Sequence, residues 1–197
     1  MDAPALRNEV GTLLQRYETE PEHVLHVARL AVELFDGLLP WHQLTGTDRL
    51  LLDTAACVHD IGWAVTLPDG KEHHKASARL IREFPWTTLT PAEVEIVALV
   101  ARYHRKAIPK ADHEAYSALS PADQRRVRVL AACLRIADGL DRRHIQRVDQ
   151  IEVFLLDSTL EIIVLTTHEA GAELAMAEKK ADLLRQDFGG EVRFCFR

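Results

Sequence analysis

The sequence lacks the features of a membrane protein and of a secreted, disulfide-bonded one. None of its apolar runs approaches the roughly 18 residues that a membrane-spanning helix needs, and no signal-peptide pattern opens the chain. Its three cysteines, Cys57, Cys133 and Cys195, are far apart and odd in number, so we expect buried, reduced thiols. These absences favour a cytoplasmic protein that has no membrane partner.

An excess of positive charge is also missing. The 197 residues include 24 lysines and arginines against 30 aspartates and glutamates, a formal net charge of −6. Because nucleic acids bind basic surfaces, this balance argues against a nucleic-acid partner. The sequence has no glycine-rich phosphate loop and no serine-hydrolase elbow. Phosphate or ester chemistry would therefore have to come from other side chains.

Hydrophobic residues make up 47% of the chain, enough for one compact domain with a full core. Before residue 148, apolar residues recur at helical spacing. The pattern predicts helices at 4–17, from Pro21, at 50–58, at 75–84, from Pro91 and from Pro121. Thr19 and Thr90 each begin a predicted capping box. The predicted loops are Leu39 to Thr47, Leu67 to Lys71 and Pro109 to Ser120.

After Arg147 the apolar residues alternate instead, which is typical of strands. Three alternating segments are present, and they contain Ile151, Val153 and Leu155; Leu160, Ile162 and Val164; and Val192, Phe194 and Phe196. A polar turn at Asp157-Ser158 predicts a hairpin, and a helix is expected from Glu173 to Gln186. The sequence thus predicts a mainly α protein, with a helical bundle over residues 1–147 and a small ββαβ unit over 148–197 packed on it.

The adjacent pair His59-Asp60 follows the apolar helical segment Leu50 to Val58. Neighbours inside a helix point about 100° apart and rarely share a ligand, but the chain loosens at a helix end. Unpaired carbonyls there carry partial negative charge, which favours a cation. The pair therefore suits half of a metal site. His23 and Asp138, each on its own predicted helix, are placed to supply the other half.

These residues, in this order, resemble the HD superfamily of metal-dependent phosphohydrolases: His23 in HVLHVARLA, His59-Asp60 in AACVHDIG and Asp138 in RIADGLDR. The segments HHKASARLIREF, VALVARYHRKAIPK and ELAMAEKKADLLRQDFGGEV are similar to the C-terminal region of the exopolyphosphatase/guanosine pentaphosphatase family. That similarity runs from about Pro21 to the end. Nothing in the sequence resembles the actin-like phosphatase region of that family, so we expect a stand-alone HD-type domain without that region's chemistry.

The resemblance implies an HD-domain bundle and a metal held by His23, His59, Asp60 and Asp138. Two imidazoles and two carboxylates suit Mn, Fe, Co, Mg or Zn. Such a metal lowers the pKa of bound water and polarises a phosphoryl group. His26 lies three residues after His23 and competes with it for the ligand role. The family motif favours His23, four residues before the Val-Ala of VARLA.

A second histidine group contains His73, His74 and His104. Its segments resemble those that complete a second metal site in two-metal HD relatives, but Ala76 stands where the usual pattern has another histidine. The group therefore predicts a second metal, a phosphate-binding or proton-transfer role, or ordinary surface histidines. His104 and Asp141 are predicted to assist Asp60 in catalysis, and Asp141 alternatively to orient a ligand histidine.

Basic residues lie near these motifs. Arg135 and Arg142 stand three before and four after Asp138, so they are its neighbours on a helix surface. Guanidinium groups beside a metal suit a phosphorylated substrate, and Lys75 adds to this charge. We therefore predict substrate contacts from Lys75, Arg135 and Arg142. The alternative is a solvated basic face, or pairing of these residues with acidic side chains.

The sequence favours a metal-dependent phosphohydrolase acting on a phosphorylated nucleotide or related small molecule. The alternative is a non-catalytic module that binds polyphosphate or nucleotide, or that mediates dimerisation. The terminal strand from Glu191 to Arg197 would offer an edge for a strand-paired homodimer.

Overall fold

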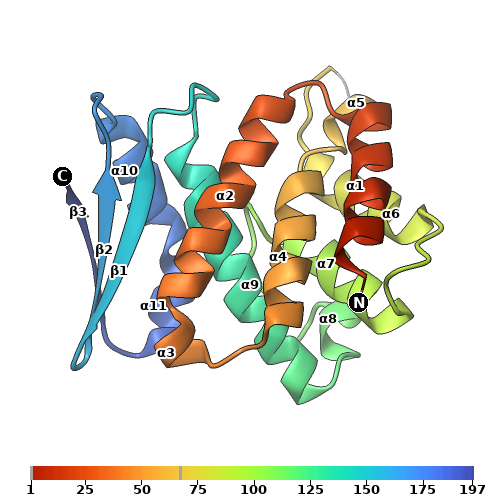
Figure 1. Cartoon of the computed structure of the whole chain (residues 1–197). Helices are drawn as coiled ribbons and strands as arrows, with labels where there is room; N and C mark the ends of the chain where they lie inside the picture. Colours follow the sequence, from red (N-terminus) through yellow and green to blue (C-terminus); the bar gives the residue numbers. More distant parts are fainter. Residues whose placement is uncertain (1, 67) are drawn as a thin grey trace.

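The computed structural model describes residues 2–66 and 68–197 of the chain. The described part contains helices followed by a three-stranded sheet (Figure 1). None of the described helices is long and apolar enough to cross a membrane. The elements are α1 (Ala3–Tyr17), α2 (Pro21–Gly37), α3 (Leu39–His42), α4 (Gly46–Val58), α5 (Trp63–Thr66), α6 (His73–Glu83), α7 (Pro91–Arg102), α8 (Glu114–Ser117), α9 (Pro121–Leu140), β1 (Gln150–Leu156), β2 (Thr159–Leu165), α10 (Gly171–Lys180), α11 (Asp182–Phe188) and β3 (Glu191–Phe196).

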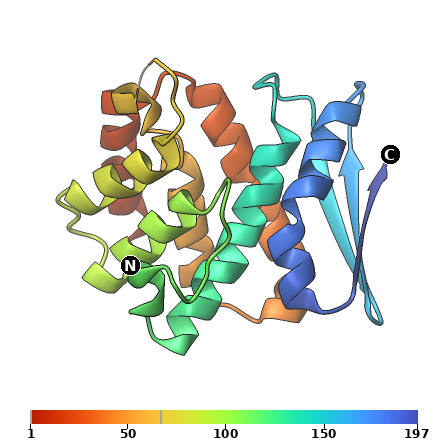
Figure 2. The same ribbon diagram turned by 180° about the vertical axis from the view of Figure 1, so that it is seen from behind.

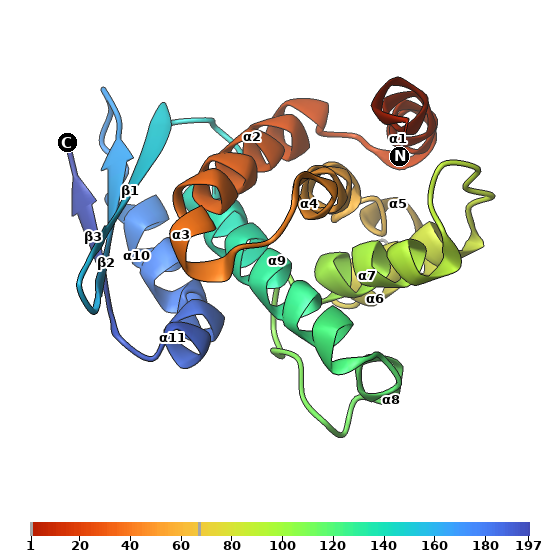
Figure 3. The same cartoon turned by 60° about the horizontal axis from the view of Figure 1, so that its bottom comes forward.

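The long helix α9 lies in the middle of the molecule and organises the other helices (Figure 3). Helices α2, α4 and α7 pack against it, α6 packs on α7, and α1 packs on α4. Helices α10 and α11 also contact α9 and lie between it and the sheet (Figure 2). The apolar positions of α9 that follow helical spacing, such as Val127, Leu130 and Leu134, are fully buried. One continuous core therefore joins the helices to the sheet.

The C-terminal part folds as the alternating pattern predicts. Strands β1 and β2 form an antiparallel hairpin that turns at Asp157, where φ is 52°. Strand β3 pairs in parallel with β2, and α10 and α11 connect the two. The sheet order is β1-β2-β3, so β3 is an edge strand. The prediction of a mainly helical protein with a small C-terminal sheet is confirmed.

The single helix predicted from Glu173 to Gln186 is wrong, because the structure has two helices that meet at Ala181. The backbone N–H of Ala181 donates to Glu178 O, three residues back, in place of the four-residue bond of an α-helix. The break turns α11 so that Leu183 and Leu184 are buried while Asp182 binds Arg135 on α9. The spacing of apolar residues could not predict the contact between Asp182 and Arg135, which are far apart in the sequence.

Several predicted loops also contain short helices. The segment 39–47 holds α3 and the start of α4, and the segment 109–120 holds α8. The predicted loop at 67–71 includes Leu67, which lies outside the described residues. The capping box predicted at Thr90 is confirmed, but the one at Thr19 is wrong, since Glu20 is the N-cap of α2 and makes no side-chain capping bond.

Candidate metal centre

His59 and Asp60 stand where α4 ends. Val58 is the last residue of the helix, and His59 is its C-cap with φ −64° and ψ −28°. The ring of His59 is held by a hydrogen bond of 2.7 Å from Nδ1 to Ala56 O. The following turn is fixed against α6, because Gly62 N donates to Ser77 Oγ at 2.9 Å. The motif thus sits at the loosened helix end that its sequence predicts.

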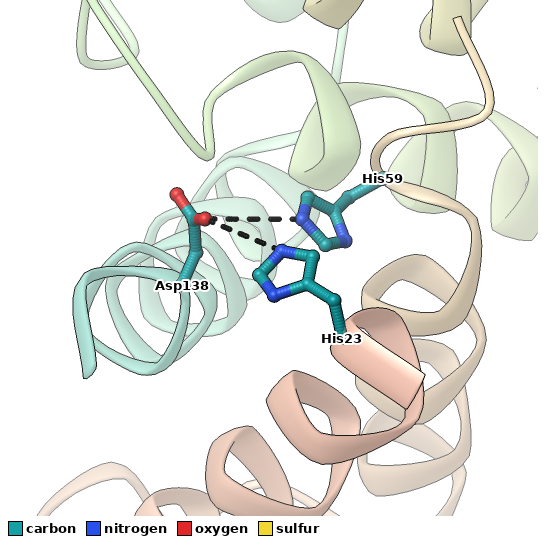
Figure 4. A group of neighbouring side chains, drawn as sticks. All are labelled: His23, His59 and Asp138. Carbon is teal, nitrogen blue, oxygen red and sulfur yellow. Dashed lines mark ion pairs between the residues drawn. The ribbon is translucent and has the colours of Figure 1, made fainter. Parts of the chain in front are cut away.

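His23 and Asp138 complete one half of the centre. Nε2 of His23 lies 3.9 Å from Asp60 Oδ2 and 3.9 Å from Asp138 Oδ1. Nε2 of His59 lies 3.6 Å and 4.0 Å from the same two oxygens. Figure 4 shows the rings of His23 and His59 directed at the Asp138 carboxylate from separate helices. Atoms that bind one metal at about 2.1 Å are roughly 3 to 4 Å apart, so these spacings fit a common cation.

His73 and His104 form the other half. Their Nε2 atoms lie 3.2 Å and 3.5 Å from Asp60 Oδ1, and 3.3 Å from each other. His59, Asp60 and His104 also form a group compatible with a metal ion. Each oxygen of Asp60 therefore faces a different pair of histidines. The guanidinium of Arg105 lies 3.2 Å from both ring nitrogens of His73 and borders this half.

The four histidines share one orientation. In each ring Nδ1 is bonded to an oxygen acceptor at 2.7 to 2.8 Å, so Nδ1 carries the proton and Nε2 offers its lone pair. The acceptors are the carboxylate of Asp141 for His23 and the carbonyls of Ala56, Gly70 and Ala101 for His59, His73 and His104. Histidines that bind metals are fixed in this way.

The centre leaves buried acceptors without donors. Among the described residues, His23 Nε2, His59 Nε2 and Asp60 Oδ1 are buried side-chain atoms that lack a hydrogen-bond partner. A buried polar atom without a partner destabilises the fold by about 1 to 3 kcal/mol. His23 Nε2 and His59 Nε2 lie in the half that contains Asp60 Oδ2 and Asp138, and Asp60 Oδ1 lies in the half that contains His73 and His104, so divalent cations in the two halves would satisfy these atoms. The residues present therefore fit a metal.

Electrostatics prepare the same residues for a cation. Burial raises the pKa of Asp60, but the neighbouring imidazoles, His59 first, outweigh it and hold that pKa well below its usual range. Burial also raises the pKa of Asp138. The ammonium group of Lys180, which contacts Asp138 Oδ2, outweighs this effect and lowers that pKa. Burial and the field of His59 depress the pKa of His104. Both carboxylates are therefore ionised and His104 is neutral at pH 7, as metal ligands must be.

A pocket of about 380 Å³ opens onto the centre. His23 and Asp60 form its inner end, and its walls are formed by Glu18, Thr19, Glu20, Trp63, Ala64 and His144. Trp63 stacks on His73 with 4.4 Å between ring centroids, and His144 stacks on His23 at 3.6 Å. Aromatic rings thus cover the faces of His73 and His23, and the pocket gives a small molecule room beside His23 and Asp60.

Other predicted residues lie elsewhere or have a different task. His26 is outside the group, with Nδ1 3.2 Å from the Arg29 guanidinium. The Asp141 carboxylate accepts bonds from His23 and from the N–H groups of Ile145 and Gln146. These bonds place Asp141 where it orients the ring of His23, which is the alternative role given by the sequence, and its catalytic role stays a prediction.

For Arg135 the structure favours the alternative of pairing with an acidic side chain. Its side chain is 4% exposed, and its guanidinium binds the Asp182 carboxylate and the Tyr103 carbonyl, which join α9 to neighbouring segments. Lys75 and Arg142 are exposed, and Lys75 pairs with Glu72. His74 is buried but lines a separate pocket rather than the centre.

Sequence reasoning missed Lys180, His144 and the Glu18 side of the pocket. Lys180 lies in the segment ELAMAEKKADLL, which the family resemblance had marked without assigning it a role. Its contact with Asp138 requires α10 to pack closely on α9. The two helices approach so closely that a Cβ added to Gly139 would lie only 3.0 Å from Ala177 Cα. No local pattern in either helix predicts that pairing.

Comparison with known proteins supports the resemblance to the exopolyphosphatase/guanosine pentaphosphatase family. Residues 7–187 match the family described as Ppx/GppA phosphatase, domain III. The chain is similar to a guanosine-5'-triphosphate,3'-diphosphate pyrophosphatase of Aeromonas hydrophila subsp. hydrophila, with 27% identity over 166 residues. That alignment covers 84% of this chain and 32% of the relative, so the chain spans about a third of the relative's length. Because the family match covers residues 7–187, which is most of the chain, the chain belongs to the Ppx/GppA phosphatase domain III family.

Proposed function

We propose that this protein is an HD-type, metal-dependent phosphohydrolase that acts on a phosphorylated nucleotide or related small molecule. The observation that carries the proposal is the common orientation of four buried histidines. Each has its Nδ1 fixed by an acceptor and presents Nε2 to the carboxylates of Asp60 and Asp138. A merely structural cluster would satisfy its own polar atoms, whereas His23 Nε2, His59 Nε2 and Asp60 Oδ1 have no hydrogen-bond partner among the described residues.

One divalent ion would be held by His23, His59, Asp60 and Asp138. A second would be held by the other oxygen of Asp60 together with His73 and His104. When bound, such ions lower the pKa of water and polarise a phosphoryl group. The two oxygens of Asp60 lie near different pairs of histidines, which supports a role for Asp60 in both halves of the centre.

The remaining residues of the site would prepare the ligands and the substrate. Asp141 keeps the proton on Nδ1 of His23, and Lys180 keeps Asp138 ionised. Trp63 and His144 cover the histidine rings and exclude bulk water, which strengthens electrostatic interactions at the centre. The pocket beside them would hold the part of the substrate that carries the phosphate. The name of the pyrophosphatase relative supports a nucleotide with linked phosphates as the class to test.

A second function is supported by the size of the match. The family is described as one domain of a phosphatase, and the chain spans about a third of the relative. This favours the alternative of a non-catalytic module that binds nucleotide or polyphosphate, or that mediates dimerisation through the edge strand β3. The two proposals differ in one measurable property, which is turnover that depends on a metal.

The deciding experiment measures phosphate release by the full chain loaded with Mn²⁺. Nucleoside phosphates, guanosine polyphosphates and inorganic polyphosphate are offered in turn. Asp60→Asn is expected to abolish release, and Asp112→Asn, which removes an exposed carboxylate away from the centre, is expected to retain it. Bound metal without any release would overturn the hydrolase and leave the binding module.

The identity of the N-terminal ligand is tested in parallel. His23→Gln is expected to reduce bound metal in elemental analysis, and His26→Gln is expected to leave it unchanged. His104→Gln is expected to lower the content from two ions to one per chain. Equal metal loss in the His23 and His26 variants would contradict the ligand set.

A further inference from the structure

A second pocket, of about 310 Å³, lies between the start of α6 and the segment that follows α7. It is distinct from the pocket beside His23, because the two share no lining residue. The residues that give it its character are the basic ones, His74, Lys75, Arg102, Arg105, Lys106 and His113. Of the described residues that line it, Glu72 alone is acidic.

The charge of this pocket is opposite to that of the molecule. The chain has a net charge of −6, yet four lysine and arginine side chains gather around this one hollow. Glu72 pairs with Lys75 and Lys106. Within the described residues, no carboxylate lies within salt-bridge distance of Arg102 or Arg105, whereas Arg128, for example, binds Asp187. The positive charges of these two guanidinium groups are therefore not neutralised by a described carboxylate and would attract an anion, although Arg105 also contacts the ring of His73.

A buried histidine gives independent support. His74 is 5% exposed and lines the pocket, and its Nδ1 has no hydrogen-bond partner among the described residues. Burying a polar atom without a partner costs free energy, so the position is explained by a ligand that satisfies the ring. An imidazole N–H, guanidinium groups and ammonium groups together form the donor set that suits phosphate oxygens.

The pocket also connects to the candidate metal centre. Arg105 lines it and at the same time lies 3.2 Å from the ring nitrogens of His73. His74 is the next residue after His73, and its ring centroid is 6.0 Å from that of His73. An anion in the pocket would therefore lie directly behind the half of the centre that His73 and His104 form.

We propose that this pocket is an anion site for a phosphate group, separate from the ligands of the metal centre. The phosphate would be either free inorganic phosphate or a further phosphate of a substrate that carries several. Only this choice of source rests on the proposed function, because binding itself requires no hydrolysis. Arg102 and Arg105 would chiefly neutralise the negative charge of the phosphate group bound in this pocket.

Calorimetric titration of the full chain with pyrophosphate, in EDTA and at low salt, tests the site without metal. Wild-type protein is expected to bind. Arg102→Gln is expected to weaken binding about tenfold or more, the effect of one lost charged hydrogen bond. Arg102→Lys keeps the charge and is expected to retain most of the affinity. Arg79→Gln removes an exposed arginine of α6 that does not line the pocket and is expected to change nothing.

The outcomes separate the possibilities. Inorganic phosphate that binds as tightly as pyrophosphate would assign the site to a free phosphate, and tighter pyrophosphate binding would assign it to a chain of phosphates. Absence of binding in wild-type protein, or equal weakening by Arg102→Gln and Arg79→Gln, would overturn the proposal. Binding that depends on Arg102 in a protein that releases no phosphate would overturn the hydrolase and leave this site intact.

Discussion

At the residue scale, the proton on Nδ1 decides what each histidine of the centre can do. A neutral imidazole has one donor and one acceptor nitrogen, and the partner of one nitrogen sets the role of the other. Three rings are fixed by backbone carbonyls of the preceding turn. His23 differs, because it stands in the first turn of α2, where its fixing acceptor is the side chain of Asp141, far along the chain. His23 is therefore the ligand whose tautomer a single substitution can change.

Asp141→Asn tests this dependence. The amide oxygen can still accept from Ile145 and Gln146, so its nitrogen faces His23 Nδ1 and forces the proton onto Nε2. We expect metal affinity to fall about 10- to 100-fold, the usual effect of losing such a partner. Competition with a chromogenic chelator measures the affinity, with Asp112→Asn as the control. Unchanged affinity in Asp141→Asn would show that Asp141 does not set the tautomer of His23.

The sequence predicts the residues of the centre better than the residues around it. His23, His59, Asp60 and Asp138 belong to ordered motifs, and the structure brings all four together. The contacts of Lys180 and Arg135 with acidic side chains could not be predicted, because both depend on how α10 and α11 pack on α9. A basic residue near a site binds substrate or a carboxylate with equal ease, and only the tertiary structure shows which acid it meets.

At the element scale, the turn that follows α4 lies close against α6, and this contact sets the position of His73 relative to His59 and Asp60. A Cβ on Gly62 would lie 2.1 Å from His73 O and 2.5 Å from Ser77 N. Real side chains do not tolerate such distances, so α6 would have to move away. The glycine of the HDIG segment thus fixes the distance between the two histidine pairs.

Gly62→Ala is expected to destabilise the protein by about 1 to 3 kcal/mol, as overpacking against a rigid backbone does. Urea denaturation measures the free energy of unfolding. The matched control is Gly11→Ala on the exposed face of α1, where a Cβ meets no atom within 4 Å. That variant is expected to gain about 0.5 to 1 kcal/mol from better helix propensity. Similar effects of the two substitutions would contradict the packing argument.

Asp48 joins two helices through one carboxylate. It completes a capping box with Thr45 at the start of α4 and also binds Arg126 on α9. Burial raises the pKa of Asp48, but the bonds from Thr45 and Arg126 outweigh it and lower the pKa below the ordinary value of 3.8. The sequence did not predict this start, since the segment was expected to be a loop.

A lowered pKa in the folded state means that the ionised carboxylate stabilises the fold. This contribution is complete above pH 3.8 and is lost as the pH falls through the folded pKa of Asp48. Asp48→Asn is therefore expected to be less stable than wild type at neutral pH and to approach it in acid. Urea denaturation across this range measures the difference between the two proteins. A difference that does not shrink below pH 3.8 would contradict the proposed role of the charge.

At the scale of the whole molecule, the candidate centre draws on separate parts of the helical bundle. Its ligands come from α2, the end of α4, α6, the end of α7 and α9, and Lys180 adds α10. The sequence order predicts the candidate ligands, but the placement of these helices around α9 is a property of the packed core. A cation that binds only the folded arrangement must stabilise all of these elements together.

Excess Mn²⁺ is expected to raise the free energy of unfolding by about 2.7 kcal/mol when its free concentration is 100 times the dissociation constant. EDTA is expected to reverse the gain. Denaturation of wild-type and Asp60→Asn protein, with and without metal, measures it. An equal gain in both proteins would place the stabilising metal outside the candidate centre.

The spread of ligands from α2 to α9 has a further consequence for a protein whose cysteines are free. A metal bound at one site by residues far apart in the sequence would be a cross-link that closes long loops of chain, as a disulfide does in secreted domains. Unlike a disulfide, this link would open and close with the supply of metal instead of with the redox state. Unfolding would then require release of the ion before the helices separate, so the lifetime of the native state would follow the metal's dissociation rate.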